Sequence, residues 1–467
     1  MRDILAFSAT HLASLIRERQ ISSVELVQAH LQQIELLAAH VNATVAVCSE
    51  TALEEARLAD EATARRESAG PLHGVPFSIK DSIAMAGTVC TAGTWGRRDA
   101  AASREDATVV ARLRGAGGIP IAKTNLPDLL FAFETDNLLF GATKNPYDLS
   151  RTSGGSSGGE AALIAACGSP CGLGSDAAGS VRVPAAFCGI ASLKPTSGRL
   201  PRTGHVPPAG GWIETLWQIG PMARHVEDLC TVMRVLVGGD GQDASVIDMP
   251  FNDPGNLSLR DLRIAFYTGN GFVPTTGDVA HAVSAAAQAL SSEVTCVEEA
   301  RPSCLADAYD LEMKLLGPDG GDALRLYLKQ VGSDRLHPLL TAWLDKLEPY
   351  RGKLDDFAGY WAELDQYRAG MLAFLRRYDA ILCPVYIQPA LPHGTSTQDD
   401  KFRGFSHTMA YNVTGWPVAV VRCQTSGEGL PIAVQVVARP FREDVALAIA
   451  LRLEERFGGW KPPVSAM

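Results

Sequence analysis

The sequence contains no long hydrophobic run, although 46% of its 467 residues are hydrophobic. No segment approaches the roughly 20 consecutive apolar residues that a membrane-spanning helix needs. The first eleven residues, MRDILAFSATH, have neither the apolar stretch nor the cleavage pattern of a secretory signal. We therefore expect a soluble cytoplasmic protein with no transmembrane segment and with a substantial hydrophobic core.

Basic clusters and closely paired cysteines are also missing. The 42 Lys and Arg residues against 52 Asp and Glu give a net charge of −10, which argues against the basic face that nonspecific nucleic-acid binding needs. Ten cysteines are spread from Cys48 to Cys423 without a C-x-x-C pair, so neither a zinc site nor a disulfide framework is indicated. We expect mostly buried, reduced cysteines, no metal, no cofactor and no nucleic-acid partner.

Short runs rich in β-forming residues alternate with helical patterns. The predicted strands cover residues 75–79, 119–122, 262–267, 380–385, 418–423 and 432–437. The last two flank residues 424–429, which predict a hairpin turn. The first sixty residues indicate helices, with Ser22 and Glu25 forming a capping box. Strands mixed with helices favour an α/β sheet covered on both faces.

Two serines lie in glycine-rich turns. Ser156 belongs to residues 152–160, TSGGSSGGE, and Ser180 to residues 174–184, GSDAAGSVRVP. Glycines allow positive φ angles and bring several backbone N–H groups close to one hydroxyl, as an oxyanion site requires. The pattern indicates acyl transfer by a serine nucleophile.

Other glycine motifs fit these turns less well. Residues 154–158 match G-x-S-x-G, but that nucleophile turn follows an apolar strand, whereas residues 145–151 are typical of a turn or loop. The segment ends in Gly159-Glu160 instead of the Gly-Lys-Ser/Thr of a phosphate loop. The third glycine of a dinucleotide motif is replaced by Ala177.

A flexible Gly/Ser linker is the remaining alternative for residues 152–160. Against it, residues 160–167, EAALIAAC, are good helix formers, so these glycines are expected to open a helix. We find no internal repeat and no low-complexity segment elsewhere in the chain.

The two serine turns resemble the amidase signature family, whose hallmark is Gly-Gly-Ser-Ser-Gly-Gly followed by Gly-Ser/Thr-Asp-x-Gly-Gly-Ser-Ile/Val-Arg-x-Pro. Further blocks that look like the family's are LHGVPFSIKD at 72–81, AKTN at 122–125, GIASLKPTSGR at 189–199, GPMAR at 220–224, NVTGWP at 412–417 and GLPIAVQVVARP at 429–440. The resemblance implies a single large mixed β-sheet sandwiched between layers of helices. It also implies an N-terminal helical segment, 1–60, packed on a catalytic domain, 61–467, with a variable helical pocket region at about 300–375.

The resemblance implies a Ser-cisSer-Lys triad. Ser180 lies where the family has its nucleophile, Ser156 where it has a bridging serine in a cis peptide, and Lys80 where it has the general base. A lysine at the end of the predicted strand 75–79 could be buried, and burial disfavours its ammonium form. A neutral Lys80 amine could then draw a proton from Ser156 while Ser156 draws one from Ser180.

Further residues are expected around this triad. The resemblance assigns the oxyanion to the backbone N–H groups of Ala177, Ala178, Gly179 and Ser180. Ala178 stands where the family often has glycine, so the site requires that this residue avoid positive φ. Asp176, Arg182 and Ser157 are expected to support the turn. The ten histidines show no recognisable pairing, and His73, which lies closest to the Lys80 strand, is expected to be structural.

Within the family, Gly159-Glu160 with AALI and residues 168–175 resemble the fatty acid amide hydrolase branch and bacterial acyl or aryl amidases. The corresponding chain of the glutamine-dependent tRNA amidotransferase usually has a serine after the second glycine pair and a different segment at residues 199–208. We therefore expect a stand-alone amidohydrolase for apolar acyl or aryl amides, which uses water and has a homodimer as one option for its assembly. The alternative is an amidotransferase-type subunit, or a hydrolase of small amides or urea derivatives, working within a multiprotein complex.

Overall fold

The computed structural model describes residues 2–67, 70–208 and 211–463. Within these ranges, eleven strands form one mixed sheet in the order β1-β3-β2-β6-β8-β7-β12-β13-β11-β9-β10. The strands are β1 Thr44–Val47, β2 Pro76–Lys80, β3 Ile119–Thr124, β6 Cys171–Asp176, β7 Ala191–Lys194, β8 Gln218–Ala223, β9 Arg263–Phe266, β10 Cys296–Glu299, β11 Ala380–Pro384, β12 Val418–Thr425 and β13 Pro431–Ala438. A small second sheet pairs β4, Lys144–Asn145, with β5, Asp148–Thr152.

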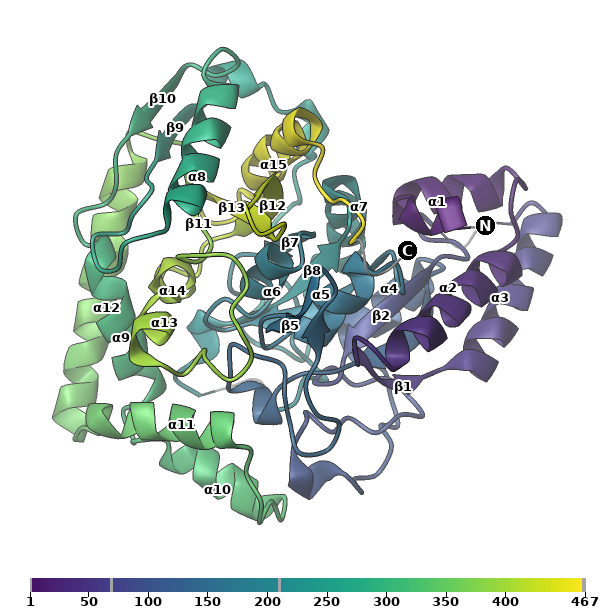
Figure 1. The fold of residues 1–467 in the computed structure, drawn as a ribbon, viewed down its shortest axis with the longest axis horizontal. Helices are drawn as coiled ribbons and strands as arrows, with labels where there is room; N and C mark the ends of the chain where they lie inside the picture. Colours follow the sequence, from purple (N-terminus) through teal and green to yellow (C-terminus); the bar gives the residue numbers. More distant parts are fainter. Residues whose placement is uncertain (1, 68–69, 209–210, 464–467) are drawn as a thin grey trace.

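Helices cover both faces of the large sheet (Figure 1). They are α1 Ala9–Arg17, α2 Ser23–Ala38, α3 Ser49–Ala64, α4 Thr108–Gly115, α5 Gly158–Ala165, α6 Arg182–Phe187, α7 Val226–Leu236, α8 Gly277–Leu290, α9 Ala308–Leu316, α10 Asp322–Gln330, α11 Pro338–Leu347, α12 Leu354–Leu375, α13 Asp399–Arg403, α14 Ser406–Val413 and α15 Glu443–Phe457. In β12, Ala419 and Val421 pack in the core that contains α7, α8 and α15. Val420 between them packs in the core that contains α5 and α6. Side chains of a strand alternate between the two faces, so both faces of this sheet are buried and the predicted α/β sandwich is confirmed.

The six strands predicted from the sequence are all present, as β2, β3, β9, β11, β12 and β13. The hairpin turn at residues 424–429 is confirmed, because β12 and β13 pair antiparallel on either side of it. The capping box of Ser22 and Glu25 is also confirmed at the start of α2.

The sequence prediction misses five strands of the sheet: β1, β6, β7, β8 and β10. β6 reads CGLGSD, and glycine is depleted in strands. A Cβ at Gly174 would lie 2.7 Å from Ser157 Oγ and 2.8 Å from a Val181 methyl, so close packing against the strand requires glycine there. The prediction of an all-helical first sixty residues is wrong at β1, which pairs with β3 at the edge of the sheet.

The prediction of a turn or loop at residues 145–151 is confirmed at Pro146 and Tyr147 but wrong at residues 148–151, which belong to β5 and pair with β4 in a hairpin. The side chain of Asn145 accepts from the Tyr147 N–H and closes the turn. β5 reads DLSRT and is mostly solvent-accessible, so its pattern lacks the apolar alternation of a typical strand. It belongs to the small sheet and does not supply the apolar strand of a G-x-S-x-G turn.

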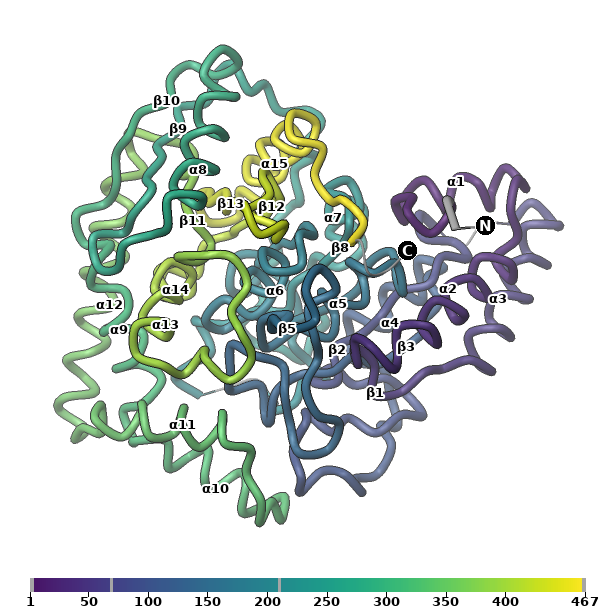
Figure 2. The backbone as a smooth tube through the Cα atoms, viewed as in Figure 1, coloured from purple at the N-terminus to yellow at the C-terminus, as the bar shows by residue number. Residues whose placement is uncertain are grey.

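Opposite ends of the large sheet carry different helical groups (Figure 1). Helices α1 to α3 lie beside the β1 edge, whereas α9 and α12 lie toward the β9–β10 edge and α10 and α11 lie below them in this view. Figure 2 follows the chain from the N-terminal segment to the C-terminal stretch after α15. The two ends meet at Arg224, whose guanidinium donates to the Phe7 carbonyl at 3.1 Å and lies 5.6 Å above the Trp460 ring.

None of the helices in the described ranges is both long enough and apolar enough to cross a membrane.

Candidate active site

A cavity of about 100 Å³ lies where the two serine turns meet. Its polar wall is formed by Ser156, Ser175, Asp176, Ser180 and His205. The rest of its lining is apolar: Leu129, Leu130, Phe131, Ala132, Phe133, Ala177, Ala178, Pro207, Pro208, Ile213, Trp217, Leu316 and Trp343. Within the described ranges, no lysine or arginine side chain lines this cavity. Leu316 and Trp343 belong to α9 and α11, which lie within residues 300–375.

Lys80 and Ser156 are in direct contact behind this wall. Lys80 is the last residue of β2 and is fully buried. Its Nζ lies 2.7 Å from Ser156 Oγ, 3.2 Å from Ser175 Oγ and 3.4 Å from the Ser175 carbonyl oxygen. The peptide bond between Gly155 and Ser156 is cis. Two residues 76 positions apart in the sequence therefore share a hydrogen bond.

Burial sets the protonation of Lys80. It lowers the pKa of the amine to about 7, against the opposing influence of the Asp176 and Glu160 charges. Glu160, on α5, is also fully buried and accepts from the hydroxyls of Ser78 and Thr124. Burial raises the pKa of Glu160 to about 7, and Lys80 opposes this shift. A substantial fraction of Lys80 is therefore the neutral amine near pH 7.

Ser180 lies in the turn between β6 and α6. Its side chain faces the same cavity as Ser156. In the described part of the chain, its hydroxyl has no hydrogen-bond partner, and neither do the backbone N–H groups of Ala177, Ala178 and Ser180. A serine hydroxyl in the same turn as three backbone N–H groups that are free to donate has the components that an oxyanion site requires.

Gly179 departs from the expected set of four donors. Its N–H donates to Asp176 Oδ1 at 2.8 Å, which engages it within the turn. Gly179 has a φ of 130°, and a Cβ there would collide with the Thr408 hydroxyl. Ala178 does not have a positive φ. An alanine is therefore compatible with this turn, although the family often has glycine there.

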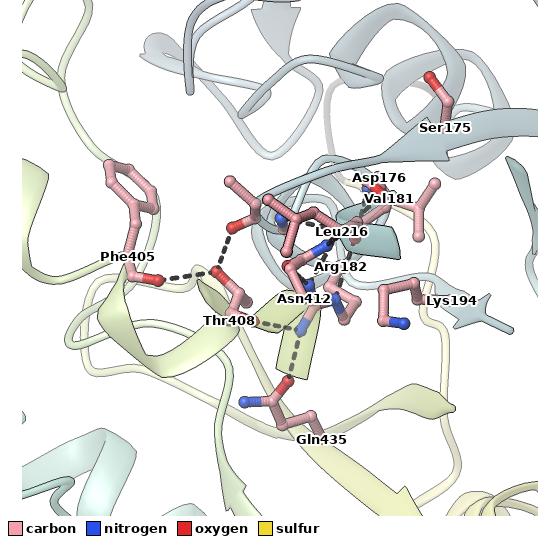
Figure 3. A network of polar contacts seen from close by, with 12 residues as sticks. Ser175, Asp176, Val181, Arg182, Lys194, Leu216, Phe405, Thr408, Asn412 and Gln435 are labelled. Carbon is pink, nitrogen blue, oxygen red and sulfur yellow. Dashed lines mark hydrogen bonds and ion pairs between the residues drawn. The ribbon is translucent and has the colours of Figure 1, made fainter. Parts of the chain in front are cut away.

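A fully buried ion pair holds this turn (Figure 3). The Arg182 Nε and Nη2 atoms each lie 2.9 Å from one carboxylate oxygen of Asp176. Arg182 also donates to the Thr408 carbonyl at 2.9 Å and to the side chain of Asn412. Asn412 Nδ2 donates to Asp176 Oδ1 at 3.0 Å. Burial alone would raise the pKa of Asp176, but the charge and hydrogen bonds of Arg182 hold it well below its usual range.

Ser157 joins the two serine turns. It precedes α5, and its N–H donates to the Ser180 carbonyl at 3.1 Å. Its hydroxyl lies 3.4 Å from the Ser175 carbonyl oxygen. The bond from the Ser157 N–H to the Ser180 carbonyl therefore holds the two serine turns next to one another, and both turns line the same cavity.

His205, like Ser175, is a site residue that the sequence does not reveal. Its Nε2 lies 3.0 Å from Ser175 Oγ, and Ser175 Oγ in turn contacts Lys80. The sequence shows no recognisable pairing for any histidine, and the fold brings His205 to Ser175 and through it to Lys80. Thirty residues separate His205 from Ser175, and no local pattern could have signalled the pair. His73, by contrast, binds Thr63 and the Ala59 carbonyl and does not line the cavity.

No cluster of three or more His, Cys, Asp or Glu side chains that could hold a metal ion occurs among the residues described by the structure.

Comparisons with known proteins give a consistent result. The model of the Amidase family matches residues 25–447. Fatty-acid amide hydrolase 2 of Homo sapiens is 31% identical, over 98% of this chain and 91% of its own length. A glutamyl-tRNA(Gln) amidotransferase chain of Syntrophobacter fumaroxidans is 32% identical, over 96% and 97% respectively. Among solved structures, 6-aminohexanoate cyclic dimer hydrolase bound to its substrate superimposes with a TM-score of 0.88 at 26% identity, over 99% of this chain and 100% of that one.

Proposed function

Since the chain belongs to the Amidase family and is an amidase, we propose that it hydrolyses carboxylic amides through an acyl-enzyme on Ser180, with Ser156 and Lys80 as the proton relay. The observation that carries this proposal is the 2.7 Å contact between a fully buried Lys80 amine and Ser156 Oγ, beside the cavity that contains the unpartnered Ser180 hydroxyl. A serine hydroxyl needs such an adjacent base to become a nucleophile at neutral pH.

In the first step, Ser180 Oγ attacks the amide carbonyl carbon. Its proton passes to Ser156 Oγ as the Ser156 proton passes to the neutral Lys80 amine, which becomes an ammonium ion. The tetrahedral intermediate then collapses, the C–N bond breaks, and the relay runs in reverse to protonate the leaving nitrogen. Water repeats the sequence in place of Ser180 and releases the acid, so the enzyme returns to its starting protonation state.

The oxyanion is stabilised by the backbone N–H groups of Ala177, Ala178 and Ser180. These donors are fixed before the substrate binds, because Asp176 and Arg182 hold the turn from behind. Preorganised donors of this kind stabilise the charge that develops in the transition state without reorganisation. Gly179 supports the turn through its N–H bond to Asp176 and is not one of the oxyanion donors in this mechanism.

The substrate is an amide with an apolar acyl or aryl group. The cavity lining is apolar apart from the serines, Asp176 and His205, and Asp176 is paired with Arg182. A cavity of about 100 Å³ is smaller than the roughly 150 Å³ of an engineered cavity that holds one benzene molecule. Short acyl groups therefore fit within the cavity, whereas a ring or a long chain would extend through its open side. Each buried CH₂ contributes roughly 0.8 kcal/mol of binding until the cavity is filled.

The second candidate is a component that releases ammonia within a multiprotein complex, or a hydrolase of small amides or urea derivatives. Relatives of the amidotransferase kind are as similar to this chain as the hydrolase kind. The cavity composition favours the hydrolase, because the described residues that line it include no cation to bind the carboxylate of a glutamine. Cleavage of only glutamine, asparagine or a carboxylated urea by the purified chain would favour the second candidate.

The experiment combines a substrate panel with active-site labelling. The purified chain alone is assayed on primary amides, anilides and long-chain amides, and amides with short apolar acyl groups should be hydrolysed best. A fluorophosphonate probe followed by peptide mass spectrometry should label Ser180. Ser180→Ala should abolish labelling and hydrolysis in a folded protein, whereas modification at Ser156 or Ser157 would reverse the assignment.

The base is tested by a matched pair of variants. Lys80→Ala removes the proton acceptor and should lower hydrolysis far more than His73→Ala, which removes a buried side chain outside the cavity. Equal losses from the two variants would refute the Lys80 relay.

A further inference from the structure

The imidazole of His205 has a polar partner at each nitrogen. The residue lies between β7 and β8 and is 6% exposed. Its Nδ1 is 3.0 Å from the Pro207 carbonyl oxygen. Its Nε2 is 3.0 Å from Ser175 Oγ and 3.1 Å from Ser82 Oγ.

These partners determine which nitrogen carries the proton. A carbonyl oxygen can only accept, so Nδ1 must be the protonated nitrogen that donates to Pro207. Burial lowers the pKa of His205 to about 3, and the positive charges of Lys80, Arg202 and Lys123 act in the same direction. The ring is therefore neutral, and its Nε2 is an acceptor.

This tautomer leaves one acceptor at Nε2 for two hydroxyls, and we assign it to Ser175, whose Oγ lies at 3.0 Å against 3.1 Å for Ser82 Oγ. The Ser175 hydroxyl proton points to His205 Nε2, which leaves Ser175 Oγ as an acceptor toward Lys80. The neutral Lys80 amine has two N–H donors and one lone pair. The Ser175 carbonyl and Ser175 Oγ take the two donors, so the lone pair is left for the proton of Ser156, its third neighbour.

We propose that His205 is a positioning residue that acts through Ser175 to direct the lone pair of Lys80 at Ser156. This inference rests on the proposed function, in which Lys80 accepts the Ser156 proton. The same arrangement serves the ammonium form, because all three neighbours of Lys80 can then accept. Protons are neither gained nor lost along the His205–Ser175 branch during the cycle.

Without an acceptor at residue 205, the Ser175 hydroxyl would turn toward its other neighbour, the Lys80 lone pair. This turn would compete with Ser156 and slow proton transfer. It would also stabilise the neutral amine relative to the ammonium ion. The buried carboxyls that act on Lys80, Glu160 and Asp176, would be unchanged.

Ser82 offers a matched control. Its hydroxyl competes with Ser175 for the single lone pair of His205 Nε2. Ser82→Ala removes the competing donor and leaves Ser175 as the partner of His205. The ring also packs on Trp217, with 4.6 Å between centroids, and His205→Phe preserves an aromatic ring at this contact.

The test measures the rate of Ser180 labelling by a fluorophosphonate probe from pH 5 to 9, in wild type, His205→Phe, His205→Gln and Ser82→Ala. His205→Phe should label about tenfold more slowly at the plateau, with the acid limb of its profile moved to lower pH by up to about one unit, the effect of one hydrogen bond. His205→Gln, whose amide oxygen can accept from Ser175, should lose less. Ser82→Ala should match wild type.

A double-mutant cycle completes the test. If His205 acts through Ser175, then His205→Phe adds little to the slow labelling of Ser175→Ala. Additive losses with an unmoved acid limb would mean that His205 only packs against Trp217, and would overturn the inference. If His205→Phe does not fold, the His205→Gln and Ser82→Ala variants still test the inference. A tenfold lower labelling rate in Ser82→Ala would contradict the assigned orientation of the Ser175 hydroxyl. Failure of the proposed function would appear separately, as wild type that labels elsewhere than Ser180.

Discussion

The most direct consequence of the buried lysine is a rise of activity with pH through the neutral range. Only the neutral amine of Lys80 can accept the Ser156 proton, and burial lowers its pKa to about 7. A single protonation with this pKa leaves about half of the enzyme active at pH 7, about 10% at pH 6 and about 1% at pH 5. The rate should therefore reach its plateau above pH 8.

Protonation of Lys80 along the acid limb of activity should leave the protein folded. Its pKa falls on folding from an ordinary 10.5 to about 7, so the folded state binds the proton less readily than the unfolded state. The contribution of Lys80 to stability is fully present above pH 10.5 and is lost as the pH falls toward 7. Below pH 7 it changes little further, so the loss of activity between pH 7 and pH 5 should occur without further destabilisation by Lys80.

The assay is kcat/KM on an uncharged amide from pH 5 to 9, with circular dichroism at each pH. Two other buried groups titrate near the same pH and need controls. The Glu160 charge raises the pKa of Lys80, so Glu160→Gln should keep the acid limb and move it to lower pH. Burial lowers the pKa of Lys194 to about 7, with Arg182 acting in the same direction. Lys194 does not contact the relay, and Lys194→Met should keep the limb near pH 7.

Two results would refute this reasoning. A flat profile down to pH 5 in folded enzyme would mean that Lys80 is not the base. Disappearance of the limb in Glu160→Gln would assign the titration to the Glu160 carboxyl instead.

Asp176→Asn leaves the buried Arg182 guanidinium without its counter-ion, and urea denaturation should show a loss of about 3–5 kcal/mol in the free energy of unfolding; a loss below about 1 kcal/mol would contradict the role of the ion pair. Gly179→Ala places a methyl group against the Thr408 hydroxyl at a φ of 130° and should reduce kcat at least about tenfold through a distorted turn, whereas the control Ala178→Gly should stay near the wild-type rate. Because protein groups supply both the base and the oxyanion donors, dialysis against a chelator should leave kcat unchanged; a loss that zinc restores would contradict the serine mechanism.

Part of this protein could be predicted from local sequence. The six strands predicted from runs of β-forming residues and the hairpin at 424–429 are present, because a short apolar run between turn signals indicates a buried strand locally. The central strand β6 could not be predicted in this way. Its glycines make close contacts with side chains that become adjacent only after folding. The hairpin of β4 and β5 could not be predicted in this way either, because its side chains are mostly polar and partly exposed.

For the site, the resemblance to the amidase signature family pointed to the serine turns, to Lys80 at the end of β2 and to the charged pair Asp176 and Arg182. These residues lie in motifs whose spacing is local and therefore readable. The bond from the Gly179 N–H to Asp176 and the path from His205 through Ser175 to Lys80 emerge only in the folded chain. Hydrogen-bond direction and burial depend on atoms that the fold brings together from β2, β6 and the segment before β8, and no local pattern carries that information.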